Sequence, residues 1–425
     1  MVQCGSRSSG VKDLLISLVI PTRDRSEYLE YAIQTAILAS KEAEFDIEIV
    51  VADNASDDRT SRLVSFLEDP RIVYVRSERR ISMRANFEAG LNAASGDYLI
   101  FIGDDDAFTI GGLKLLSRLL RSNEYDVVNW PQTNYTWPGV RCSKGWGKLR
   151  YRDFVGEVKS QSLFAVGQKF LNATYANYHQ GALIYHGCVS RKVINEARLG
   201  AKGCYFMGAS PDLYAAVANC FSSQGRIGYL SYSVTIGGAS PKSNGLNASL
   251  APEKQYSNEY NRFLSESKGD ETFSIIGPSM KSFGLYVLEA LIMCLGREKL
   301  RDMLDIEEWR RRLIREISDL AAEYRVENFA CAARLFALLG EQFVPPADSQ
   351  VTTHSDKLSA RGQSIRKRVW SLTSLEVSRG DHARDIMAFA KVVQRVCPAH
   401  DILVNGVTAQ RISRRLKALI NAVFL

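Results

Sequence analysis

The chain has 425 residues, of which 46% are hydrophobic and 24% are charged, as in an ordinary globular protein of two or three domains. Its formal net charge of +7 is modest for this length, so it gives no reason to expect a nucleic-acid partner. A net positive charge also suits binding to anionic nucleotides or to an anionic membrane surface, and the charge alone does not discriminate between these partners. The absence of a long apolar run predicts no membrane-spanning helix.

The eight cysteines are scattered, without a Cys-x-x-Cys pair or a Cys/His cluster at zinc spacing. The first ten residues are mostly polar and contain no apolar signal-peptide core. We therefore expect a cytoplasmic protein with reduced thiols.

The first 130 residues alternate between strand and helix patterns. Apolar runs predict strands, and apolar residues at helical spacing predict helices between them. Repeated βα units of this length predict an α/β fold with a mostly parallel sheet flanked by helices. The expected strands cover residues 14–20, 45–52, 71–75, 98–102 and 126–130. Ser26 caps the first expected helix, the second starts at Asp57, and two more cover residues 84–95 and 112–120.

Beyond residue 130 the pattern loosens into short elements and loops, and from about residue 275 it becomes helical. Phe283 to Leu295 predicts a buried helix, and residues 383–395 and 408–425 are helical again. We predict one domain over residues 1–250, with halves of about 14–130 and 131–250. A mainly helical C-terminal region follows over 251–425, with a possible linker at about 345–364.

Polar residues follow three of the expected strands, at the edge where open α/β sheets bind ligands. The most informative group is Asp104-Asp105-Asp106, because adjacent carboxylates repel unless a cation or hydrogen-bond donors offset them. Mg²⁺ or Mn²⁺ takes one or two carboxylates together with substrate phosphates. The pattern predicts a metal site at Asp105 and Asp106, and a solvated acidic loop is the alternative.

Asp53 ends the second expected strand. Its alternative role is to form a turn or to cap the next helix. Asn54, Ser56 and Asp57 can cap that helix equally well, which would leave Asp53 free to contact a ligand.

In order and spacing, four segments of residues 14–130 resemble the family-2 glycosyltransferases of the GT-A fold. They are Ser17–Thr22 (SLVIPT), Val50–Asp58 (VVADNASDD), Asn86 with Gly96-Asp97-Tyr98, and Phe101–Asp106 (FIGDDD). The chain departs from the family at Gly103, which replaces the first aspartate of the family's D-x-D motif.

The resemblance implies inverting transfer of a sugar from a nucleotide-sugar donor, with Mg²⁺ or Mn²⁺ as cofactor. It places the nucleotide on Pro21, Thr22 and Arg23, the base on Asp53, and the ribose or diphosphate on Asp104. Arg84 is the expected phosphate contact, and Arg79 and Arg80 compete for that role.

The resemblance also implies a carboxylate base downstream, which falls on Asp212. The residue lies just before an expected helix, where Pro211 replaces the family's usual glutamate. Asp212 would remove the proton from the attacking hydroxyl. Capping of the helix is the alternative.

For the acceptor, the family's elements fall on a cluster of aromatic residues, and aromatic faces suit both sugar rings and a protein core. Trp137, His179 and His186 are the candidate contacts, each with a structural role as alternative. The cluster comprises Trp130, Tyr135, Trp137, Trp146 and Tyr151.

Processive family members carry a Q-x-x-R-W segment and membrane spans, which this chain lacks, so we expect a single addition to a saccharide or lipid-linked saccharide. Arg411 to Leu425 combines basic and apolar residues, as in a helix that lies on the inner face of a membrane. A docked terminal helix is the alternative.

The residues after the first expected strand argue against two other classes of enzyme. A sugar-phosphate nucleotidyltransferase would carry a G-x-G-T-R loop after the first strand, and a nicotinamide enzyme would carry G-x-G-x-x-G there; this chain has Pro-Thr-Arg-Asp. A non-catalytic binding protein on a GT-A fold stays open as a further alternative.

Overall fold

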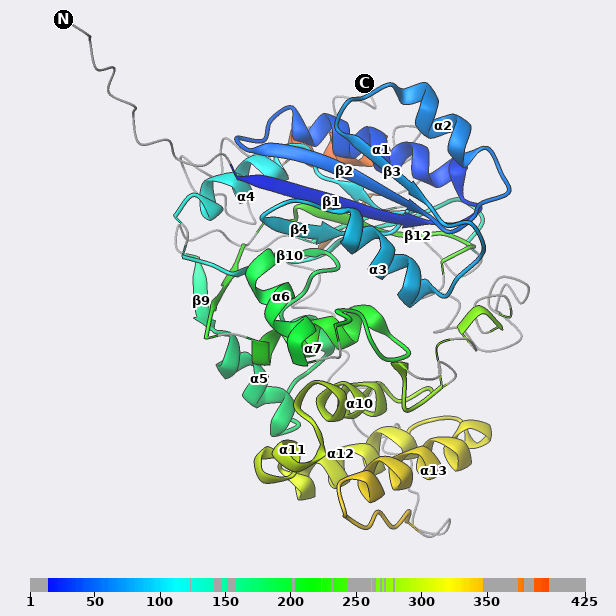
Figure 1. Ribbon diagram of the computed structural model, residues 1–425, viewed down its shortest axis with the longest axis vertical. Helices are drawn as coiled ribbons and strands as arrows, with labels where there is room; N and C mark the ends of the chain where they lie inside the picture. The colour runs from blue at the N-terminus through cyan, green and yellow to red at the C-terminus, as the bar shows by residue number, and fades with distance from the viewer. Residues whose placement is uncertain are drawn as a thin grey trace, which may run out of the picture.

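A computed structural model describes residues 14–122, 124–140, 147–150, 158–200, 203–222, 224–230, 232–243, 261, 265–267, 270, 273–277, 280–346, 374–377 and 386–396. The molecule is elongated, with a sheet layer at one end and a layer of helices at the other (Figure 1).

Eight strands form the main sheet, in the order β3-β2-β1-β4-β10-β6-β11-β9. Strands β1 to β4 are parallel, β10 runs antiparallel between β4 and β6, β11 is parallel to β6, and β9 is antiparallel to β11. The strands are β1 (Leu15–Thr22), β2 (Asp46–Asp53), β3 (Ile72–Arg76), β4 (Tyr98–Phe101), β6 (Val127–Asn129), β9 (Lys159–Ser162), β10 (Gly187–Ser190) and β11 (Arg226–Tyr229).

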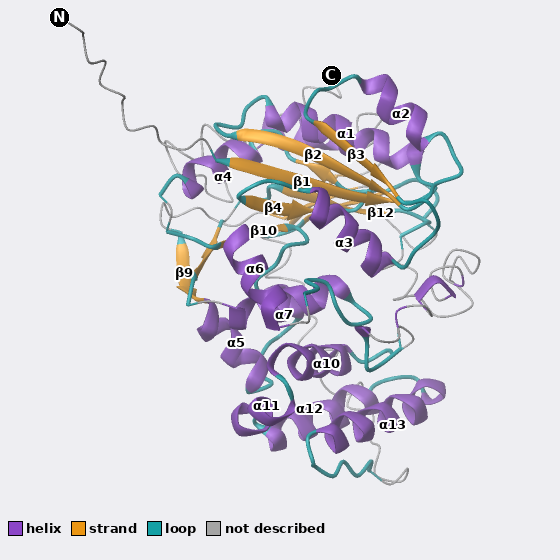
Figure 2. Cartoon of the chain, in the orientation of Figure 1, coloured by secondary structure: helices purple, strands orange, loops and turns teal. Residues whose placement is uncertain are grey.

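Both faces of the sheet's centre are buried, because helices cover each side (Figure 2). Alternate residues of one strand therefore join different cores: Val19 lies in one, and Leu18 and Ile20 lie in the other. Helices α1 (Ser26–Ser40), α2 (Thr60–Leu67) and α4 (Gly112–Leu120) cover one face, and α3 (Met83–Ala93) and α6 (Arg191–Gly200) cover the other.

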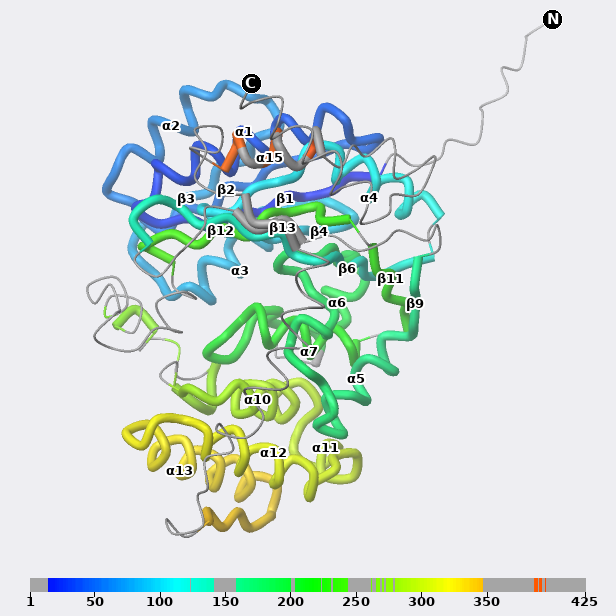
Figure 3. The backbone as a smooth tube through the Cα atoms, turned by 180° about the vertical axis from the view of Figure 1, so that it is seen from behind, coloured from blue at the N-terminus to red at the C-terminus, as the bar shows by residue number. Residues whose placement is uncertain are grey.

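A second sheet of five strands, in the order β13-β8-β7-β12-β5, lies behind the first (Figure 3). Strand β5 starts directly after Asp106 and pairs with β12, so this pairing brings residues 235–239 to the acidic loop. The strands are β5 (Ala107–Phe108), β7 (Thr133–Thr136), β8 (Gly147–Arg150), β12 (Thr235–Ala239) and β13 (Ser374–Val377), and α15 (Ile386–Val396) packs against α1 and β5.

The remaining helices form one continuous layer below the sheet. Trp309 on α12 is fully buried, and its indole nitrogen donates to the carbonyl oxygens of Phe170 and Leu171 at 3.0 and 3.1 Å. The C-terminal helices thus share a core with α5 and α7. The elements are α5 (Leu163–Leu171), η1 (Tyr178–Gln180), α7 (Pro211–Ser222), α10 (Phe283–Leu295), α11 (Arg297–Met303), α12 (Ile306–Ser318) and α13 (Ala322–Leu338).

The predicted α/β class is confirmed, with a mostly parallel sheet, flanking helices and a helical C-terminal region. No helix in the part of the chain that the structure describes has the length and apolarity to cross a bilayer. The linker beyond residue 346, Trp146, Tyr151 and the helix predicted at 408–425 lie outside the described residues.

Two predicted helix starts are wrong. Ser26 is the first residue of α1 rather than its cap, and its backbone N–H donates to Asp58 at 2.9 Å. Helix α2 starts at Thr60 rather than Asp57, and the Asp58 carboxylate accepts the Thr60 N–H at 2.8 Å. One aspartate therefore binds the first residues of both helices, because the two helix starts lie side by side beyond the sheet edge.

Candidate active site

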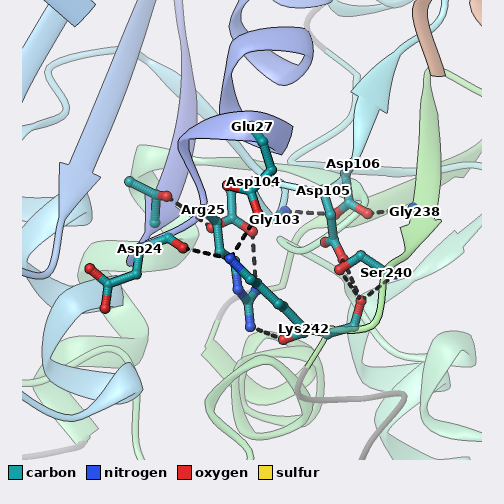
Figure 4. A network of polar contacts seen from close by, with 12 residues as sticks. Asp24, Arg25, Glu27, Gly103, Asp104, Asp105, Asp106, Gly238, Ser240 and Lys242 are labelled. Carbon is teal, nitrogen blue, oxygen red and sulfur yellow. Dashed lines mark hydrogen bonds and ion pairs between the residues drawn. The ribbon is translucent and has the colours of Figure 1, made fainter. Parts of the chain in front are cut away.

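The ends of β1, β2 and β4 place the predicted donor residues at one edge. The register of β1 and β2 sets Thr22 opposite Asp53. The Thr22 hydroxyl donates to Asp104 Oδ2 at 2.8 Å, and Arg25 Nη1 lies 3.1 Å from the other oxygen (Figure 4). Asp104 is therefore fixed between the end of β1 and the start of α1.

Asp105 is buried under residues 240–243, which follow β12. Its Oδ2 accepts hydrogen bonds from the hydroxyls of Ser240, at 2.6 Å, and Ser243 (Figure 4). Burial, with the charges of Asp106 and Asp104, raises the pKa of Asp105 to about 6. A cation beside Asp105 would offset all three effects.

Asp106 is the anchor of the loop. It accepts hydrogen bonds from the backbone N–H groups of Gly103 and Gly238, both at 2.6 Å, and from the Tyr185 hydroxyl at 2.9 Å. His186 Nε2 lies 3.1 Å from Asp106 Oδ2. Burial opposes ionisation, but His186 and these donors outweigh it and hold the pKa of Asp106 below its ordinary value. A cation at Asp106 would therefore have to displace an existing donor.

Two glycines are required by close approach around this loop. A Cβ on Gly103 would lie 2.7 Å from the Tyr185 hydroxyl oxygen and 3.1 Å from Asp106 Oδ2. A larger residue at position 103 would therefore require the Tyr185 or Asp106 side chain to shift. A Cβ on Gly238 would lie 1.7 Å from the carbonyl oxygen of Asp105, which backbone cannot accommodate.

The donor atoms at Asp105 fit a hard divalent ion, because carboxylate and hydroxyl oxygens of Asp105, Ser240 and Ser243 converge there. Among the described residues, no group of three or more His, Cys, Asp or Glu side chains is arranged to hold a metal.

Asp53 has a side chain with 0% exposure and does not have the free carboxylate that the sequence suggested. It accepts the Tyr74 hydroxyl at 2.5 Å and the Ser56 N–H at 2.9 Å, and Arg76 Nε lies 3.4 Å away. The expectation that neighbouring residues would relieve Asp53 of its turn-forming role is therefore wrong.

Arg23, predicted at the nucleotide, and Arg84, predicted at the phosphates, are paired with acids from one segment that the sequence gave no reason to single out. Arg23 forms an ion pair with Glu266. Arg84 binds Asp270 through two nitrogens, at 2.9 and 3.1 Å, and lies 3.8 Å from the centre of the Phe273 ring. These carboxylates occupy the guanidinium edges that a diphosphate would need.

Asp212 lies in the first turn of α7 and is partly exposed. It accepts hydrogen bonds from the hydroxyls of Ser210, at 2.9 Å, and Tyr178, at 3.3 Å. The Tyr185 hydroxyl donates to Asp106 in the acidic loop. Burial raises the Tyr185 pKa well above its ordinary value, and the charges of Asp106, Asp105 and, least, Asp212 add to the effect.

The three predicted acceptor contacts lie in different environments. Trp137 is buried against Tyr28 and donates to the Asp105 carbonyl oxygen at 2.8 Å. His186 is also buried, with Nδ1 2.8 Å from the Thr235 hydroxyl oxygen. These two side chains brace the acidic loop from inside, where a saccharide has no access. His179 is exposed, and its ring lies 4.2 Å from that of Tyr178.

Known proteins resemble this chain in the part that holds the acidic loop. Residues 17–181 match the model of glycosyl transferase family 2, so this segment is similar to that family. The match covers β1 to η1 and so includes Asp53 and the acidic loop, whereas Asp212 lies beyond it.

Two curated relatives are similar over about a quarter of the chain. An abequosyltransferase of Salmonella typhimurium is 36% identical over 112 residues, which are 26% of this chain and 33% of the relative. A GalNAc(5)-diNAcBac-PP-undecaprenol beta-1,3-glucosyltransferase of Campylobacter jejuni is 34% identical over 113 residues, 26% of this chain and 35% of the relative. The similarity spans about a third of each relative's length.

Among solved structures, S. aureus TarS in complex with UDP-GlcNAc is similar at 15% identity, with a TM-score of 0.41 over 77% of this chain and 84% of that one. A mannosyltransferase from Pyrobaculum calidifontis in complex with GDP-Man and Mn²⁺ is similar at 14% identity, with a TM-score of 0.41 over 91% and 88% of the two chains.

Proposed function

We propose that the protein transfers a sugar from a nucleotide-sugar donor to a hydroxyl of a saccharide or lipid-linked saccharide, with inversion at the anomeric carbon. The observation that carries this proposal is the buried Asp105, set between two further carboxylates at the carboxyl edge of parallel strands. Such a cluster favours a bound cation and, through it, a diphosphate.

The nucleoside would lie along Pro21, Thr22 and Asp53 at the ends of β1 and β2, with Asp104 beside the ribose or diphosphate. Mg²⁺ or Mn²⁺, held by Asp105 and by Asp106 if a donor is displaced, would neutralise charge on the departing diphosphate. The guanidinium groups of Arg23 and Arg84 would bind the same phosphates once they leave Glu266 and Asp270.

On the acceptor side, Asp212 would take the proton from the attacking hydroxyl, whose oxygen bonds to the anomeric carbon as the nucleoside diphosphate leaves. Its partial exposure and its place in the first turn of α7 support this role. The Tyr178 and Ser210 hydroxyls would hold the carboxylate in position.

The lipid-linked acceptor class is suggested by the undecaprenol named in the Campylobacter relative. A cytoplasmic location with contact to the inner face of the membrane through residues 411–425 remains a prediction, and those residues lie outside the described part of the chain.

The test incubates the protein with a panel of nucleotide-sugars and Mg²⁺ or Mn²⁺ and measures release of nucleoside diphosphate. We expect metal-dependent release with at least one donor. Asp105→Ala should abolish it, because it removes the oxygen ligand around which the site is built. Asp302→Ala, at an exposed aspartate of α11, is the matched control.

Release that persists in excess chelator would contradict the metal role. Donor binding without turnover would instead favour a non-catalytic binding protein.

A further inference from the structure

An exposed aromatic ring lies near the proposed base. Phe283, the first residue of α10, is 61% exposed, although most of its helix is buried. Its ring is nearly parallel to that of Tyr178, with an interplanar angle of 17° and 6.1 Å between ring centres. Single exposed apolar side chains are common on protein surfaces, so the position of this ring against Tyr178, and not its exposure alone, singles it out.

Tyr178 connects this ring to the proposed chemistry. It lies in the single-turn helix η1, and its hydroxyl donates to Asp212 Oδ2 at 3.3 Å. The exposed His179 ring lies against the same tyrosine. The His179 and Phe283 rings therefore both lie against Tyr178, the tyrosine that contacts Asp212. Figure 1 shows α10, which carries Phe283, beside α7, which carries Asp212.

The backbone that carries Phe283 is fixed on both sides. Glu316 accepts hydrogen bonds from the Ser282 hydroxyl and the Gly284 N–H, each at 2.9 Å. A Cβ on Gly284 would lie 2.7 Å from the Glu316 carboxylate, so this turn is closely packed. The exposure of Phe283 is therefore a property of a well-held helix start rather than of a frayed end.

We propose that Tyr178, His179 and Phe283 form an acceptor platform, on which a sugar ring of the acceptor stacks while one of its hydroxyls faces Asp212. The apolar C–H face of a pyranose matches the electron-rich face of an aromatic ring, and its hydroxyl edge stays available for polar contacts. The platform rests on the proposed function, and it assigns acceptor selection in part to the C-terminal helical region.

The test compares Phe283→Ala with Phe283→Tyr, which keeps an aromatic face. In the transfer assay, Phe283→Ala should raise the KM for the acceptor about tenfold, a change in the range expected for one lost ring contact. The donor KM and the slow hydrolysis of donor by water should not change, and Phe283→Tyr should restore the acceptor KM. Phe66→Ala, at an 83% exposed phenylalanine of α2, is the matched control.

A second measurement does not depend on turnover. Saturation-transfer NMR with glucose, galactose and N-acetylglucosamine as probes should give a signal in the wild type that Phe283→Ala loses and Phe66→Ala keeps. Transfer by the wild type with an unchanged acceptor KM in Phe283→Ala would overturn the platform and leave the proposed function intact. A saccharide signal that depends on Phe283, without any sugar transfer, would contradict the proposed function and support the platform. A signal that does not depend on Phe283 would overturn the platform.

Discussion

The acidic loop after β4 and the Asp212 turn at the start of α7 carry the two halves of the proposed chemistry, and they differ in how their carboxylates are partnered. In the loop, Asp106 is surrounded by backbone and side-chain donors and Asp105 is covered by two serine hydroxyls. Asp212 is partly exposed, beside exposed aromatic rings. A preformed loop suits a ligand with fixed charge and geometry, whereas a more open turn suits acceptors of varied shape.

The largest expected effect tests the open side of this comparison. Asp212→Asn keeps the shape and the hydroxyl partners but removes the proton acceptor. Sugar transfer should fall by about 10²–10⁴, the usual contribution of a positioned general base. Donor affinity, measured by calorimetric titration with the nucleoside diphosphate and metal, should stay the same. A variant with full activity would show that the base lies elsewhere.

A smaller effect tests the donor side. Asp270→Asn weakens the ion pair that engages Arg84, so the arginine becomes easier for a phosphate to capture. We expect the donor KM to fall by about three- to tenfold, equivalent to roughly 1 kcal/mol. Glu266→Gln should act in the same direction through Arg23. Weaker donor binding in Asp270→Asn would show that the carboxylate positions Arg84 instead of competing for it.

The smallest effect concerns a buried glutamate that holds segments next to both sites. Glu289 on α10 accepts the N–H groups of Ile275 and Ile276, at 2.5 and 2.9 Å, and that of Ala209 at 3.5 Å. Burial outweighs these bonds and raises the Glu289 pKa above its ordinary value of 4.5. The folded protein therefore binds this proton more tightly than the unfolded chain, so stability should fall as pH rises from that value through the raised pKa.

Glu289→Gln should remove this part of the pH dependence while keeping an acceptor oxygen. Urea unfolding of wild type and variant between about pH 4 and pH 8 measures it, and the free energy of unfolding should fall more steeply with rising pH in the wild type than in the variant. Identical slopes in the two proteins would refute the assignment.

The sequence predicted the donor half well, because its signals are local. Each strand there is an apolar run, and the polar residues that follow it mark the edge of the sheet. The structure confirms strands at the positions predicted, within one or two residues at most ends. The α10 helix was likewise predicted from its apolar composition.

The partners of the site residues could not be predicted in this way. Ser240 reaches Asp105 from 135 positions away, and Asp270 reaches Arg84 from 186. No local pattern marks these contacts, because they depend on how β5 pairs with β12 and on where the segment around Asp270 lies. For the same reason the sequence left an acceptor contact and a structural role open for Trp137 and His186, and tertiary packing buries both.

The close approach of Gly238 to Asp105 also bears on how the protein is made. A nascent chain that has emerged as far as residue 130 already contains the three adjacent aspartates. It does not yet contain the glycine N–H and the serine hydroxyls that donate hydrogen bonds to them. Until residues 235–243 are made, Asp105 lacks both the segment that covers it and its two hydroxyl donors. We therefore expect the strands of the first 130 residues to form before the acidic loop takes its final arrangement.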